Sequence, residues 1–101
     1  MVGEGYYIGA GLKFQIEISA SGFDQNKDNY TIDFYCGDDH LQFTQADVFN
    51  HDGKFYLPVP TDNLQPGMLK IVTTAYVPDD DFEGGFRKEI AVNYFKFLKE
   101  I

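Results

Sequence analysis

The stretch LQPGMLKIVTTAYVP, residues 64–78, decides the fold because it joins a rigid turn directly to a long strand. Pro66 presets φ at about −65° in the turn, and Gly67 accepts a positive φ after it. Leu64 gives the loop an apolar anchor that plugs the edge of a sandwich, and the β-branched and aromatic residues that follow suit a pleated strand. The segment therefore predicts the crossover of a β-sandwich.

Period-two alternation dominates the rest of the chain. Apolar residues at Leu12, Phe14, Ile16 and Ile18 alternate with polar ones, which is typical of a strand with one face on a core. An Asp-Gly turn signal within residues 50–53 predicts a hairpin. The other strand-like runs are residues 30–36, 41–43, 47–49, 54–57, 68–77 and 87–98. We therefore expect an all-β, immunoglobulin-like β-sandwich of about seven antiparallel strands.

The last run changes parity. Ile90, Val92 and Tyr94 share one face of the predicted strand, whereas Phe95 falls on the other. A β-bulge near residues 93–95, or burial of both faces, would explain the change. At 101 residues the chain fits a single domain over residues 1–101, with residues 1–10 a loose edge strand or a tail.

The charge of the chain restricts its partners. Sixteen Asp and Glu stand against eight Lys and Arg, a formal net charge of −8. Nucleic acids and anionic membranes are bound mainly by cationic side chains, so we expect neither as a partner. Residues 1–7 lack the basic and apolar parts of a signal peptide, and we expect a soluble chain. Its cellular location stays open.

The single cysteine, Cys36, lies in the alternating run that also contains Tyr30, Ile32 and Phe34 on the same face. A lone cysteine excludes an internal disulfide. The position predicts a buried structural thiol, because a free cysteine packs as a small apolar side chain. The acidic residues that follow it would raise its pKa, which disfavours a nucleophilic role.

Two groups of residues are candidate metal sites, and each also has an explanation without a metal. Asp24, Asn26 and Asp28 copy the opening of a calcium loop, but the glycine and the bidentate glutamate of that pattern are missing. An ordinary solvated turn explains these residues as well. His40 and His51 each lie beside an Asp, without the tight spacing of a metal site. No cofactor is predicted.

An acidic loop and outward tyrosines are the candidate contact sites. Four carboxylates within residues 79–83 fit a solvated surface loop, a divalent ion or a basic protein partner. Tyrosines on the outward face of a strand favour contact with protein or sugar, although packing by neighbouring loops explains them too. The candidate protein-binding residues are Asp79, Asp80, Asp81, Phe82, Glu83, Tyr35 and Tyr76.

No catalytic set is assembled in the sequence. Ser19 and Ser21 lack a nucleophile elbow, and no glycine-rich loop links a strand to a helix. We therefore expect a non-enzymatic structural or adhesion module that binds protein partners, including copies of itself. The alternative is a carbohydrate-binding β-sandwich assisted by calcium. A small hydrolase is a third hypothesis, which only scattered Asp and His residues support.

Two resemblances go with these motifs. Leu64-Gln65-Pro66-Gly67, followed by an alternating strand, resembles the E-to-F corner of fibronectin type III domains. The order of motifs over residues 30–92 is similar to that of immunoglobulin-like modules in tail-fibre and baseplate-associated proteins of phages and prophages from gut Bacteroides-type bacteria. The late loop departs from that group, because Glu83-Gly84-Gly85 replaces its Asp-Gly. The resemblance implies a structural adaptor in a virion or mobile-element assembly, and it supplies no catalytic residues.

Overall fold

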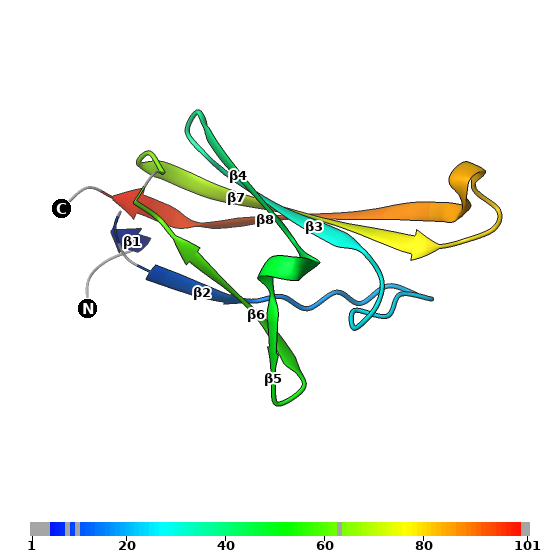
Figure 1. The fold of residues 1–101 in the computed structure, drawn as a ribbon. Coiled ribbons are helices and arrows are strands. Elements are labelled where there is room, and N and C mark those ends of the chain that lie inside the picture. The colour runs from blue at the N-terminus through cyan, green and yellow to red at the C-terminus, as the bar shows by residue number, and fades with distance from the viewer. Residues whose placement is uncertain (1–4, 8, 10, 63, 100–101) are drawn as a thin grey trace.

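The computed structural model describes residues 5–7, 9, 11–62 and 64–99, and it confirms the all-β sandwich (Figure 1). The described part of the chain contains eight strands and two short 3-10 helices, joined by loops. They are β1 (Gly5–Tyr7), β2 (Gly11–Gln15), β3 (Tyr30–Cys36), β4 (Asp39–Thr44), η1 (Gln45–Asp47), β5 (Phe49–His51), β6 (Lys54–Pro60), β7 (Gly67–Pro78), η2 (Glu83–Gly85) and β8 (Phe86–Lys99).

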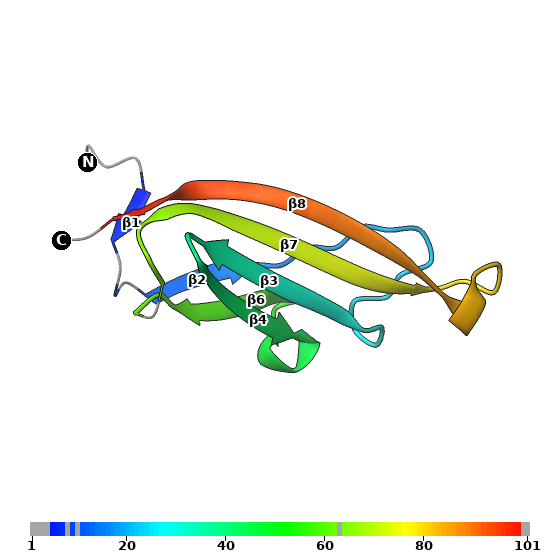
Figure 2. The same ribbon diagram turned by 90° about the horizontal axis from the view of Figure 1, so that it is seen from above.

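The strands form two sheets. Sheet A has five strands in the order β1-β8-β7-β3-β4, and sheet B has three in the order β2-β6-β5. All neighbours are antiparallel except β1 and β8, which pair in parallel over Gly5–Tyr7 and Phe97–Lys99. Figure 2 shows β8, β7, β3 and β4 side by side in one layer, with β2 and β6 in the layer beneath. Part of the N-terminal lead is thus an edge strand.

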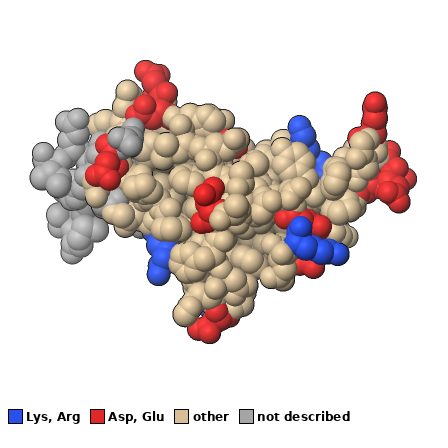
Figure 3. Space-filling view, viewed as in Figure 1, with Lys and Arg blue, Asp and Glu red and all other residues tan. Residues whose placement is uncertain are grey.

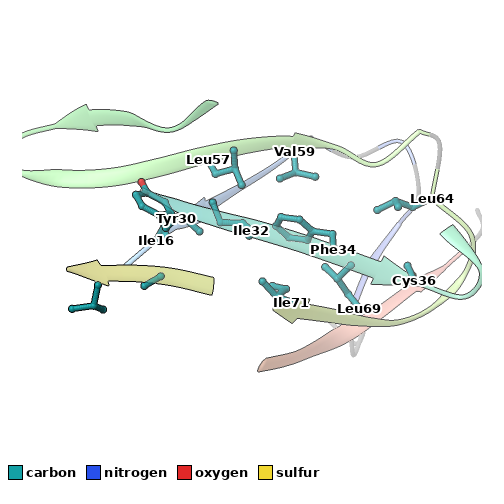
Figure 4. Close-up of a cluster of buried hydrophobic side chains, with 12 residues drawn as sticks. Ile16, Tyr30, Ile32, Phe34, Cys36, Leu57, Val59, Leu64, Leu69 and Ile71 are labelled. Atoms are coloured by element: carbon teal, nitrogen blue, oxygen red, sulfur yellow. The ribbon is translucent and has the colours of Figure 1, made fainter. Parts of the chain in front are cut away.

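The core lies between the two sheets (Figure 4). Ile32 and Phe34 of β3 and Leu57 of β6 have no exposed surface. The ring of Phe34 packs against that of Phe14 of β2, with centroids 5.3 Å apart. Leu64 is 4% exposed and belongs to this core, which confirms its expected role as the anchor of the loop before β7.

β2 is shorter than the alternation predicts, because it ends at Gln15 rather than near Ile18. The backbone then leaves sheet B after one last hydrogen bond, from the Ile16 N–H to the Phe55 carbonyl oxygen at 2.8 Å. The Gln25 amide takes over the next backbone groups, donating to the Ile16 carbonyl and accepting from the Ile18 N–H. The apolar alternation therefore continues to Ile18, although the backbone beyond Ile16 is hydrogen-bonded to a side chain and not to a strand.

The turn between β5 and β6 is the predicted hairpin. Asp52 and Gly53 take φ values of 53° and 79°, the left-handed pair that suits a two-residue hairpin loop. The Gly53 N–H donates to the side chain of Asn50 at 3.1 Å, which closes the turn.

The β7–β8 hairpin is the longest element and reaches past the other strands (Figure 1). Its tip holds η2, in which Gly84 and Gly85 have positive φ and open space where a Cβ would stand. The register changes once: Gly67 lies opposite Leu98 and Leu69 opposite Phe95, so β8 carries one extra residue there. The bulge predicted near residues 93–95 is therefore wrong in its position, because the register stays regular through Phe95 and shifts only beyond it.

Candidate functional site

One row of β8 side chains points away from the core. Ile90, Val92 and Tyr94 are 62%, 48% and 67% exposed, although they are apolar or aromatic and lie in the middle of a strand. They occupy the outer face of sheet A, opposite Thr74, Val72 and Lys70 of β7. The alternative expectation, burial of both faces of this strand, is therefore wrong.

The backbone of the same residues points to the open side of the sheet. The N–H of Tyr76 in β7 donates to the carbonyl oxygen of Asn29 at 3.0 Å, which lies on the β3 side. Tyr76 and its opposite residue Lys88 thus form a pair without hydrogen bonds between them. By the alternation of an antiparallel ladder, Lys88, Ile90, Val92 and Tyr94 all direct N–H and C=O away from β7.

No described strand pairs with β8 on that side between residues 86 and 96. Figure 2 shows β8 as one long border of sheet A, with β1 beside only its last residues. We call residues 88–94 of β8, with their outward side chains and outward backbone groups, the β8 edge. It offers both a hydrogen-bonding ladder and apolar side chains.

A groove runs beneath the β8 edge. It has a volume of about 420 Å³ and separates the segment Glu17–Ser21 from the inward face of β7 and β8. Thr73, Ala75 and Ala91 form part of its sheet side. A second hollow of about 350 Å³ adjoins it, since Glu17 and Thr73 line both. The sandwich is therefore not filled along this side.

The other borders of the two sheets are less suited to binding. β4, at the opposite border of sheet A, has six residues and presents His40, Gln42 and Thr44 on the outer face. In sheet B, β5 has only three residues and β2 has five. Among the described strands, the β8 edge alone combines length with exposed apolar side chains.

The two tyrosines predicted as contact residues, Tyr35 and Tyr76, lie on the same outer face of sheet A, but in other strands. Tyr35 of β3 stacks on His40 of β4, and the ammonium of Lys70 lies 5.5 Å from its ring centroid. Tyr76 of β7 has the ammonium of Lys88 at 5.9 Å from its ring centroid. Each of these rings thus has a neighbour from the next strand.

The predicted acidic loop lies at the tip of the β7–β8 hairpin, away from Tyr35, and Figure 3 shows acidic side chains gathered at that end. Asp79 is tied to its surroundings, because its carboxylate accepts from the Asp81 N–H at 3.0 Å and pairs with Arg87. The bond from Asp81, together with Arg87, lowers the pKa of Asp79. Asp80, Asp81, Phe82 and Glu83 are exposed.

The calcium-loop candidates form a hydrogen-bonded turn. The Asp24 carboxylate accepts from the Asn26 N–H at 2.9 Å, and the Asp28 carboxylate accepts from the Asp24 N–H at 2.7 Å. Both carboxylates are therefore engaged with the local backbone. In the described part of the chain, no three His, Cys, Asp or Glu side chains gather into a group that could hold a metal ion.

Cys36 is buried, as predicted, and its thiol donates to the carbonyl oxygen of Gln65 at 2.9 Å. Burial raises the pKa of this thiol, and the nearby Asp39 adds to the shift. His40 and His51 pair with different carboxylates, those of Asp33 and Asp52.

Comparisons with family models, curated proteins and solved structures give no match for this chain. Within the described ranges there is no helix of the length and apolar character that a membrane crossing requires.

The sequence alone did not single out the β8 edge. Its signal was present, because the positions that alternate with Ile90, Val92 and Tyr94 include Glu89 and Asn93, which suit a core face poorly. Parity shows that the two sets face opposite ways, but it does not show that both are exposed, as they are in the folded chain.

Proposed function

We propose that this chain is a non-enzymatic assembly module that binds a protein neighbour through the β8 edge. The observation that carries the proposal is the run Ile90–Tyr94, which is uncharged, has exposed apolar side chains and directs unpaired backbone groups to the open side of the sheet. An extended polypeptide matches such an edge, because it supplies complementary N–H and C=O groups together with side chains on the same face.

The lack of edge protection supports this reading. Sheet borders that stay free are usually blunted by charged side chains, proline or a bulge. In β8 the charged residues Arg87, Lys88 and Glu89 stand at one end, and the bulge comes after Phe95. The stretch between them has none of these devices, as a binding edge requires.

We also propose that the sandwich is of the immunoglobulin-like type. In such domains one sheet contains strands C, F and G with added strands at its borders, and the other contains B, E and D. The order β4-β3-β7-β8 against β2-β6-β5 supports this assignment. A place in a virion is the setting that the resemblance to phage modules implies, and it rests on that resemblance alone.

Selection of peptides from a random library tests the function without a known partner. Peptides selected on the wild-type chain are measured on a double variant of the edge, Ile90→Lys/Val92→Lys. The matched control is Phe49→Lys/Met68→Lys, which replaces two exposed apolar side chains, 43% and 42% exposed, outside the β8 edge and outside the acidic loop. Circular dichroism and thermal unfolding establish that all three proteins are folded.

We expect peptides that bind the wild type and the control and lose about tenfold or more affinity for the edge variant, since a buried Lys opposes apolar contact. These peptides should also protect the amides of Ile90 and Val92 from hydrogen exchange. Binders that ignore the edge substitutions, or that leave these amides unprotected, would overturn the proposal.

Carbohydrate binding, the alternative function, predicts a different result. A glycan array with and without EDTA tests it, and a calcium-dependent signal that is unchanged in the Ile90→Lys/Val92→Lys variant would favour this alternative. Tyr35 is the exposed ring to test by alanine substitution, because it lies on the outer face of sheet A.

A further inference from the structure

We infer that the β8 edge pairs with the β8 edge of a second copy of this chain, antiparallel, with the two-fold axis at Ala91. The inference rests on the proposed function and adds to it the identity of the partner and the register of pairing. A two-fold contact of this kind uses the same surface on both copies, so the edge has to be complementary to itself.

The backbone meets this condition. Antiparallel pairing about Ala91 sets Ile90 opposite Val92 of the second copy, and Lys88 opposite Tyr94 of the second copy. All four residues direct N–H and C=O toward the open side, so each of these opposed pairs exchanges hydrogen bonds. Ala91 then faces its own copy in a pair without hydrogen bonds.

The side chains are complementary in the same register. On the outer face, Ile90 and Val92 of both copies form one apolar cluster that covers side chains now 62% and 48% exposed. Lys88 comes opposite a tyrosine ring, the kind of contact that it already makes with Tyr76. On the inner face, Ala91 is small enough for close approach at the axis, and Glu89 comes opposite Asn93.

Charge favours this arrangement over parallel pairing and over an axis at Glu89. Each chain carries a net charge of −8, and part of it lies in the exposed carboxylates within Asp79–Glu83 at the hairpin tip. Antiparallel pairing places the two tips at opposite ends of the dimer, whereas parallel pairing would place them together. Moving the axis to Glu89 would set that carboxylate against its own copy, which destabilises a cross-strand pair.

Cysteine cross-linking tests the axis directly. The Cα atoms of a non-hydrogen-bonded antiparallel pair lie about 4.5 Å apart, inside the range of about 4.4–6.8 Å that a disulfide spans. Ala91→Cys should therefore cross-link to its own copy under mild oxidation. Lys88→Cys is the matched control in the same strand, because Lys88 lies three residues from the axis and about 20 Å from its own copy at the rise of a strand.

We expect at least about tenfold more disulfide dimer from Ala91→Cys than from Lys88→Cys, since only the first pair lies within disulfide range. A mixture of Lys88→Cys and Tyr94→Cys chains should yield the heterodimer. Wild-type protein should stay uncross-linked, because its only thiol, Cys36, is buried. Sedimentation velocity should show a dimer fraction that rises with salt, as the repulsion between acidic chains is screened.

Equal cross-linking of Ala91→Cys and Lys88→Cys would indicate random collision and overturn the inference. Strong self-cross-linking of Ile90→Cys or Val92→Cys with none at Ala91→Cys would overturn the register. If the chain stays monomeric while selected peptides still protect the amides of the edge, self-pairing is wrong and the assembly function stands. If neither copies nor peptides bind the edge, both proposals fail.

Discussion

Nε2 of His40 donates a hydrogen bond to a carboxylate oxygen of Asp33 at 2.7 Å, across the pair of strands β3 and β4. The same oxygen accepts from the side-chain amide of Gln42 at 2.9 Å. Asp33 is only 8% exposed, and it is the one charged residue among the buried side chains of the described part of the chain. Two donors from one neighbouring strand thus hold a buried carboxylate on the outer face of sheet A.

Replacing that carboxylate tests its contribution to stability. Asp33→Ala should lower the free energy of unfolding by about 1–2 kcal/mol, because two hydrogen bonds are lost while their donors can still reach water. Asp33→Asn keeps an acceptor oxygen and should lose less. Urea unfolding measures both, with Asp80→Ala in the exposed loop as the control. A loss in Asp33→Asn as large as in Asp33→Ala would contradict the role of the acceptor.

Acid should weaken the tip of the β7–β8 hairpin through Asp79. Its pKa is lowered in the folded chain by the Asp81 N–H and by Arg87, so the unfolded chain binds the proton first as pH falls. The stabilisation is complete above the unfolded pKa of about 3.9 and is lost as pH falls through the folded pKa.

Asp79→Asn should therefore make the free energy of unfolding depend less on pH below about 4. Unfolding in urea at a series of pH values measures this slope. Asp80→Asn removes a carboxylate from the same loop without touching Arg87, and it serves as the control. Equal slopes for wild type and Asp79→Asn would show that the contact does not contribute.

The thiol of Cys36 should be almost unreactive in the native protein. It is buried, and its raised pKa leaves little thiolate near neutral pH. Labelling with a thiol-specific reagent should be slow in buffer and fast in denaturant. Rapid labelling of the native chain would show that the loop at Gln65, which accepts the thiol hydrogen, opens readily.

The core should depend strongly on Phe34, whose ring contacts those of Phe14 and Phe43 from two other strands. Phe34→Ala should lower the free energy of unfolding by about 3–5 kcal/mol, since the cavity lies between both sheets. Phe49→Ala removes the same ring from a position 43% exposed and should cost far less. Thermal and urea unfolding compare the two.

The sequence predicted the sandwich well, because local signals decide it. The bend at Pro66 before β7, the Asp52-Gly53 hairpin and the alternation within residues 30–36 each depend on neighbouring residues only. The sequence did not predict where β2 ends. After Ile16 the backbone bonds to the side chain of Gln25, which lies outside the alternating run, instead of to a neighbouring strand. The alternation of apolar and polar residues cannot show that a side chain will take the place of a strand partner.

The candidate site was less accessible to sequence analysis. Residues 79–83 and the two tyrosines attracted attention through their charge and their rings, and they remain predictions as contact sites. In the sequence, Ile90 and Val92 look like the buried face of an ordinary strand, because such residues are typical of core positions. Their exposure depends on whether another part of the chain covers the outer face of sheet A, which is a property of the whole fold.

The open tip of the long hairpin makes this protein a convenient carrier of foreign peptides. An epitope spliced between Gly84 and Gly85 enters an exposed turn in which neither glycine has a neighbour where a Cβ would stand, and it lies far from the packed rings of the interior. Antibody binding to such a fusion, with an unchanged melting temperature, is the expected result, and a marked fall in that temperature would show that the tip helps to hold the domain together.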